Sequence, residues 1–172
     1  LNYKNFLSLS PRSRLTPVIY YSLGDAYFNL GSYDSAIVYY EKILSDHANT
    51  SYVFDAVNGI QYCYIARGES DKAVRMIDNF VLRNPNSEFA DRLFLKKGEI
   101  FYSLRNYEQA KNGYKEFIAY FAKSKYVADA YYWVGKSAQN LNQFEEAILN
   151  YNIVINNYSS SEIATSAVIE AG

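Results

Sequence analysis

Apolar residues in this chain recur every three to four positions, the spacing of amphipathic helices. In a first run, Tyr20, Leu23, Tyr27 and Leu30 share one helical face. In a second run, one helical face is formed by Tyr33, Ala36, Ile37, Tyr40, Ile43 and Leu44, and the polar residues of the run lie elsewhere. Only two or three residues separate the two runs, so we expect two helices that pack as an antiparallel hairpin.

The hairpin pattern repeats with a period of 37 residues. The alanines Ala36, Ala73, Ala110 and Ala147 mark this period, and several aromatic and glycine columns keep the same register. A small hydroxyl residue precedes each first helix and is predicted to cap its opening turn: Ser13, Thr50, Ser87, Ser124 and Ser161. An acidic residue is predicted in the first turn of each second helix: Asp34, Asp71, Glu108 and Glu145. One hairpin cannot bury its apolar faces alone, so the units must stack on one another.

Small residues are expected where the two helices of a hairpin approach most closely. We expect Gly24 and Gly98 to face Ala36 and Ala110, because the missing side chains let two backbones come together. The second unit departs from this pattern, since Gln61 occupies its glycine column. Its hairpin is therefore predicted to be splayed or bent.

These features resemble the tetratricopeptide repeat (TPR). The resemblance rests on glycine followed by tyrosine in the first helix, glycine near the turn, alanine followed by an aromatic residue in the second helix, and Pro85 after it. The family period is 34 residues. The longer 37-residue period resembles repeats of bacterial cell-envelope proteins, of the outer-membrane assembly lipoprotein or Tol–Pal coordinator type. The resemblance implies an all-α fold, a right-handed α-α superhelix (TPR solenoid) of antiparallel helical hairpins.

The period divides the chain into one array of repeats. Residues 1–12 are predicted as the second helix of a preceding repeat, and residues 161–172 as the first helix of a truncated fifth repeat. The four complete repeats are predicted at 13–49, 50–86, 87–123 and 124–160. We therefore expect this chain to be a piece of a longer protein.

Composition and charge exclude several functions. The 17 Lys and Arg residues balance 18 Asp and Glu residues, which argues against a nucleic-acid partner. One cysteine allows no internal disulfide, and one histidine cannot supply a multi-histidine metal site. No apolar run approaches the ~18 residues of a membrane span, so no direct membrane insertion is expected.

No catalytic site, cofactor site or metal site is predicted. His47 is interpreted as a solvated loop residue, and Cys63 as a small buried residue in mid-helix. The triplet from Gly135 to Ser137 mimics the end of a phosphate-binding loop, but it falls within a helix and Ala130 stands where the first glycine should be. The chain is therefore interpreted as a non-enzyme.

The resemblance implies a concave binding surface formed by the first helices of the repeats. Its columns select a set rich in aromatic residues with single charges between them: Tyr21, Asp25, Phe28, Asn58, Tyr62, Ile65, Leu95, Glu99, Tyr102, Tyr132, Lys136 and Gln139. Aromatic residues are enriched at protein contacts. An equally weighted alternative is that Tyr62, Tyr102 and Tyr132 simply pack along the helix stack.

The columns also exclude one known family function. Family members that hold a chaperone's carboxylate tail use Lys, Asn and Arg in this groove, whereas Asp25 and Glu99 here would repel a carboxylate. The leading hypothesis is a non-catalytic scaffold that binds a peptide, a helix or a protein surface in the groove. The alternatives are a spacer or assembly domain of a larger enzyme or envelope complex, and a self-association module. The resemblance favours the bacterial cell envelope (periplasmic or outer-membrane-associated), with the cytoplasm as the alternative.

Overall fold

A computed structural model describes residues 13–172, in which nine α-helices and no strand are found. The helix predicted over residues 1–12 lies outside the described residues. The helices are α2 (Thr16–Asn29), α3 (Tyr33–Asp46), α4 (Tyr52–Ala66), α5 (Ser70–Arg83), α6 (Ala90–Ser103), α7 (Tyr107–Tyr120), α8 (Val127–Asn140), α9 (Phe144–Asn157) and α10 (Ala164–Ala171). They fall into two compact units that divide after Ala90.

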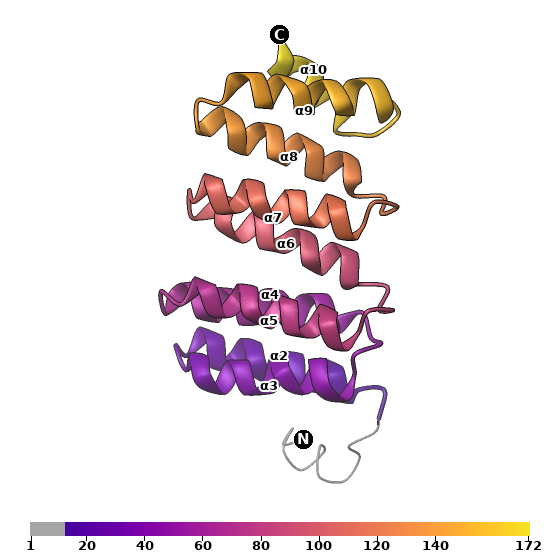
Figure 1. The fold of residues 1–172 in the computed structure, drawn as a ribbon. Coiled ribbons are helices and arrows are strands. Elements are labelled where there is room, and N and C mark those ends of the chain that lie inside the picture. The colour runs from indigo at the N-terminus through magenta and orange to yellow at the C-terminus, as the bar shows by residue number, and fades with distance from the viewer. Residues whose placement is uncertain (1–12) are drawn as a thin grey trace. The chain divides into compact units, whose positions relative to one another are not determined.

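Each unit consists of helices that run antiparallel to their neighbours in sequence (Figure 1). In the first unit α2 pairs with α3, and α4 packs against both of them. In the second unit α7 packs against α8, α8 pairs with α9, and α10 packs against α9. The predicted all-α repeat fold of antiparallel helical hairpins is confirmed. Helices α4 and α5 are packed less tightly against each other than α2 and α3 are, as expected for the atypical second unit.

A residue in the left-handed conformation ends the first helix of each hairpin. These residues are spaced by the 37-residue period: Gly31, Gly68, Arg105 and Asn142, with φ of 71°, 71°, 59° and 59°. In each case the next residue's N–H donates to a carbonyl five residues back, as from Ser32 to Tyr27 at 2.9 Å. This is the Schellman arrangement, which reverses the chain within two or three residues.

The small hydroxyl residues act one turn earlier than predicted. The hydroxyls of Ser13, Ser87 and Ser124 accept the backbone N–H two residues on, at 3.2, 3.3 and 3.2 Å, in the turn just before the helix. Each precedes its helix by two or three residues and forms a turn, in which its own carbonyl accepts an N–H three residues on. The Ser13 carbonyl, for example, accepts from the Thr16 N–H at 3.0 Å. The hydroxyl of Thr50 instead donates to the His47 carbonyl at 2.9 Å. The predicted acidic first turns of the second helices are confirmed.

The glycines face tyrosine rings, and the expectation that they face the repeat alanines is wrong. A Cβ placed on Gly98 would lie 2.5 Å from Cε1 of Tyr114, and one on Gly135 would lie 2.5 Å from Cε1 of Tyr151. A Cβ on Gly24 would likewise collide with the ring of Tyr40. All three tyrosines are fully buried. The missing Cβ of each glycine therefore leaves room for a tyrosine ring, which is larger than the alanine side chain expected there.

The second hairpin changes both partners of this contact together. At the tyrosine column it has Ile77, and at the glycine column Gln61, and both side chains are buried. The smaller Ile77 thus replaces the tyrosine in the hairpin where Gln61 replaces the glycine. The repeat alanines Ala36, Ala73, Ala110 and Ala147 are also buried, which fits the close packing of each second helix.

Ion pairs around Glu146 join the hairpins of the second unit. The Lys111 side chain on α7 is only 5% exposed, and its Nζ lies 2.6 Å from Oε1 of Gln143 and 3.3 Å from Oε2 of Glu146. Lys115 Nζ lies 2.5 Å from the other Glu146 oxygen. The hydrogen bond from Lys115, followed by that from Lys111, holds the pKa of Glu146 below its usual range.

Replacing Gly98 with alanine tests the glycine–tyrosine contact. At a helix position without a clash, Gly→Ala stabilises by about 1 kcal/mol. Here we expect Gly98→Ala to destabilise by about 1–3 kcal/mol, because the new Cβ meets the buried Tyr114 ring. In a Tyr114→Ile background, which copies the second hairpin, the same substitution should become neutral or stabilising. Urea unfolding of the unsubstituted chain, the two single variants and the double variant measures this. If the single variant Gly98→Ala were more stable than the unsubstituted chain, the glycine–tyrosine contact would be contradicted.

Enlarging a repeat alanine should separate two helices. Ala110 is fully buried, so Ala110→Leu is expected to lower stability by about 1–3 kcal/mol through overpacking. Ala119→Leu on the same helix is the matched control, since Ala119 is exposed. Thermal unfolding should show a lower Tm for Ala110→Leu only. Equal melting curves for the two variants would count against close packing at Ala110.

The lowered pKa of Glu146 predicts a pH-dependent contribution to stability. A carboxylate whose folded pKa is depressed stabilises fully above its unfolded pKa, and this stabilisation is lost as pH falls through the folded value. We expect Glu146→Gln to cost about 1 kcal/mol at neutral pH and to have little effect at an acidic pH below the lowered pKa of Glu146, where this carboxylate is protonated. Urea unfolding at both pH values checks this, with the exposed Glu145→Gln as control. A deficit independent of pH would refute the ionic contribution.

Candidate functional site

The predicted concave-face residues lie on the first helix of each hairpin. Six of them are on α2 and α4 in the first unit, and the other six are on α6 and α8 in the second. The environments of these two groups differ.

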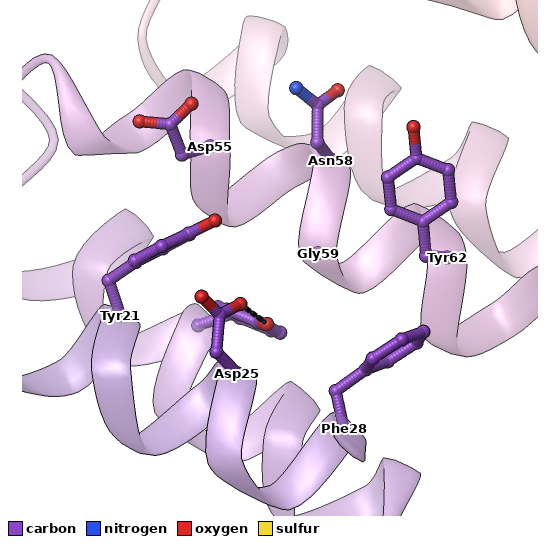
Figure 2. A pocket seen from close by; sticks show the side chains of 8 residues that line it. Tyr21, Asp25, Phe28, Asp55, Asn58, Gly59 and Tyr62 are labelled. Carbon is purple, nitrogen blue, oxygen red and sulfur yellow. Dashed lines mark hydrogen bonds between the residues drawn. The ribbon is translucent and has the colours of Figure 1, made fainter. Parts of the chain in front are cut away.

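A pocket of about 300 Å³ opens between α2 and α4 in the first unit. Five of the six predicted residues of this unit line it, and Ile65 does not. The complete lining is Tyr21, Asp25, Phe28, Tyr40, Asp55, Asn58, Gly59 and Tyr62. Figure 2 shows the side chains of α2 on one side of the hollow and those of α4 on the other.

Tyr40 forms the base of the pocket and is held in place by two glycines. Its ring is 1% exposed, and a Cβ on either Gly24 or Gly59 would collide with it. Its hydroxyl donates a hydrogen bond of 2.7 Å to Oδ1 of Asp25 (Figure 2). Burial, followed by this bond to a carboxylate, raises the pKa of Tyr40 far above its usual value. The base is therefore a fixed surface that orients Asp25.

The pocket has a negative character. Asp25 and Asp55 contribute two carboxylates, and burial, followed by the charges of Asp25 and Asp55, raises the pKa of Tyr21 between them. No lysine or arginine among residues 13–172 forms an ion pair with either carboxylate. Oδ1 of Asn58 is buried without a hydrogen-bond donor. The pocket thus offers two carboxylates without an ion-pair partner among the described residues and one amide oxygen without a donor.

Aromatic rings form the outer part of the pocket. Tyr62 on α4 is 58% exposed, and it borders the hollow together with Phe28 of α2 (Figure 2). Phe28 is half-buried and packs against Tyr33 with ring centroids 5.5 Å apart. For Tyr62 the structure therefore favours a free surface over packing along the helix stack.

The aromatic residues of the second unit pack against each other instead. Tyr132 is 8% exposed and lies against Trp133 and Tyr151, with centroids 5.5 and 5.7 Å away. Tyr102 lies against Trp133 at 4.8 Å, and Leu95 is buried. Here the alternative that the aromatic residues stack along the helices describes the contacts.

The polar members of the predicted set in the second unit also have partners. Glu99 pairs with Lys96 at 3.0 Å, and Lys136 pairs with Glu170 at 2.8 Å. Oε1 of Gln139 accepts a hydrogen bond of 3.1 Å from the Tyr151 hydroxyl. Glu99 and Lys136 thus have ion-pair partners within their own unit, which Asp25 and Asp55 lack among the described residues.

Three residues of the pocket were not in the predicted set. Asp55 lies one helical turn before Asn58 on the same face of α4, so extending the i, i+4, i+7 series by one turn would have found it. Tyr40 lies on the apolar face of the second predicted helix, and the predicted columns do not include Gly59. Nothing in the repeat columns indicates that two glycines from successive first helices meet one ring.

The other candidate chemistry lies apart from this pocket. His47 is half-buried against Tyr20, with ring centroids 6.0 Å apart. Cys63 is fully buried, and desolvation raises the pKa of its thiol to about 11. In residues 13–172 no group of three or more His, Cys, Asp or Glu side chains is placed to hold a metal ion. No helix in that range is long and apolar enough to cross a bilayer.

Comparisons with known proteins identify the repeats. One tetratricopeptide repeat model matches residues 17–45, and a second matches residues 92–124 and 129–161. The matched segments leave out α4 and α5, the hairpin that departs from the repeat pattern. No curated protein matches the sequence.

Solved structures share the fold at low sequence identity. BtubC (BKLC) from P. vanneervenii has a TM-score of 0.60 at 14% identity, over 92% of this chain and 71% of that chain. The kinesin light chain TPR-like repeats of Podospora anserina have a TM-score of 0.57 at 12% identity, over 93% and 86%. A tetratricopeptide repeat protein from Parabacteroides merdae has a TM-score of 0.56 at 18% identity, over 96% of this chain and 61% of its own length.

The family assignment follows from the sequence matches and the fold together. The matched segments cover more than half of the chain, and each contains a helical hairpin of the kind described above. The chain belongs to the tetratricopeptide repeat family.

Proposed function

We propose that this chain is a non-catalytic scaffold that binds a peptide, a helix or a protein surface along the α2–α4 face. Tetratricopeptide repeat proteins are generally protein-interaction scaffolds. The observation that carries the proposal for this face is the open pocket with an exposed tyrosine at its rim. Exposed aromatic side chains beside a preformed hollow are typical anchors of protein contacts.

The pocket is suited to binding because its walls are already fixed. Tyr40 is fully buried, and the walls are the sides of two helices rather than loops. A surface that is preformed loses little conformational entropy when a partner docks. The face of the second unit, with its partnered side chains, is proposed to contribute contact area rather than anchor pockets.

The chain has two alternative proposed roles and a proposed place in the cell. Under the alternative proposals, the chain is a spacer or assembly domain, or a self-association module, and the α2–α4 face needs no ligand. The 37-residue period supports a place in the bacterial cell envelope. These alternatives predict no specific peptide at the α2–α4 pocket, and this distinguishes them from the scaffold proposal.

Substitution of Tyr62 tests the scaffold proposal. Peptides selected for binding to the chain from a displayed random library serve as ligands, and their Kd is measured by fluorescence anisotropy. We expect Tyr62→Ala to weaken binding about tenfold or more, because it removes an aromatic anchor at the rim. Its Tm should stay within about 2 °C of the unsubstituted protein, since the side chain is mostly exposed.

Leu82→Ala is the matched control, because Leu82 is 79% exposed on α5, outside the pocket. It should leave both the Kd and the Tm unchanged. If no peptide is selected, or if the selected peptides bind Tyr62→Ala as tightly as the unsubstituted chain, the α2–α4 face is not the binding surface.

A further inference from the structure

We propose that the α2–α4 pocket receives a cationic side chain, a lysine or an arginine, of the protein or peptide that the scaffold binds. This inference rests on the proposed function and names the chemistry of the partner. It follows from the polar groups of the pocket, from its aromatic rings, and from a comparison with the equivalent positions of the second unit.

The polar groups at the pocket call for a hydrogen-bond donor with positive charge. Asp25 and Asp55 are two carboxylates without an ion-pair partner among the described residues, and Oδ1 of Asn58 is buried with no donor. An ammonium or guanidinium group carries several donors and no acceptor, so it complements this set. An anionic ligand would meet two like charges instead.

The aromatic rings add to this preference. Tyr21, Phe28 and Tyr62 border the same hollow as the two carboxylates (Figure 2). The face of an aromatic ring attracts a cation, and the aliphatic stem of lysine or arginine packs well on such a face. A hollow with acidic and aromatic walls therefore fits both parts of a long basic side chain.

The second unit shows what occupies these positions when the chain fills them itself. Two periods after Gly59 and Tyr62, the sequence has Trp133 and Lys136. The Trp133 ring stacks on Tyr114, which is the equivalent of Tyr40, at 6.3 Å, and it lies against Tyr102 at 4.8 Å. Lys136, at the position of Tyr62, pairs with Glu170 of α10, whereas Glu99, at the position of Asp25, pairs with Lys96. In the first unit Gly59 has no side chain, the Tyr40 ring packs against its backbone, and the position of Lys136 is taken by Tyr62.

Binding of single amino acid derivatives to the 172-residue chain tests this inference without knowledge of the partner. The probes are Nα-acetyl-arginine amide and Nα-acetyl-lysine amide, with Nα-acetyl-citrulline amide as a neutral match for arginine in shape. Two-dimensional ¹H–¹⁵N NMR of the labelled protein follows each titration. We expect saturable shifts of the amides of residues 21–28 and 55–62 with a cationic probe, at a Kd on the order of 1 mM.

Paired variants assign the binding to the two carboxylates. Asp25→Asn with Asp55→Asn keeps the size of both side chains, and the new amide carbonyl at position 25 can still accept the Tyr40 hydroxyl hydrogen bond, so the fold should persist. We expect this double variant to weaken binding at least about tenfold. Glu41→Gln with Asp46→Asn changes the net charge equally at exposed positions of α3 and should leave binding unchanged.

Three results would overturn the inference: no saturable shift with either cationic probe, equal binding of the citrulline probe, or undiminished binding by the Asp25/Asp55 variant. The outcome is separable from that of the scaffold proposal. If library peptides bind in a way that depends on Tyr62 but no cationic probe binds, the scaffold proposal is retained and the cation site is refuted. A cationic probe that binds where no peptide can be selected would retain the site and refute the scaffold.

Discussion

Each typical hairpin depends on one contact, in which a glycine of the first helix faces a buried tyrosine ring of the second helix. Tyr40, Tyr114 and Tyr151 each lie where the facing glycine has no Cβ, and each ring is almost wholly excluded from water. A ring of this size in a helix interface contributes much apolar burial, but only if the opposite helix yields the space. The second hairpin satisfies the same constraint differently, with Ile77 in place of the ring and Gln61 in place of the glycine.

The same constraint determines whether the surface of the first helices is open or filled within each unit. Tyr40 is in contact with glycines from two successive first helices, so the α4 backbone covers its ring at Gly59 without adding a side chain there, and the pocket remains beside this contact. Tyr114 has Gly98 on one side but Trp133 at the position of Gly59, and the indole ring covers it. Its hydroxyl is buried without a partner, whereas the Tyr40 hydroxyl reaches Asp25. One residue of difference in a repeat column thus separates a hollow from a packed surface.

Much of the fold could be predicted from sequence because it depends on local, periodic features. The alanine period, the short turns and the acidic first turns follow from single columns read one at a time. The glycine partners could not be read in this way, because which residue a glycine faces depends on the rotation of two helices. The role of the hydroxyl residues was predicted only in part, since a residue two or three positions before a helix can belong to a turn that precedes the helix.

The candidate site was also predicted only in part. The columns that gave five residues of one pocket also gave Leu95 and Tyr132, which are buried. Exposure depends on the neighbouring column, where a glycine or a tryptophan decides the outcome.

The geometry of Asp25 has a consequence for how strongly a cation can be held. The hydrogen bond from Tyr40 fixes one oxygen of this carboxylate, so the side chain loses little freedom when a ligand binds to the other oxygen. Asp55, by contrast, is exposed, and its attraction for a cation is screened by salt. The two carboxylates therefore have different roles: Asp25 provides a fixed contact at short range, and Asp55 raises the local negative potential that brings a basic side chain to the pocket.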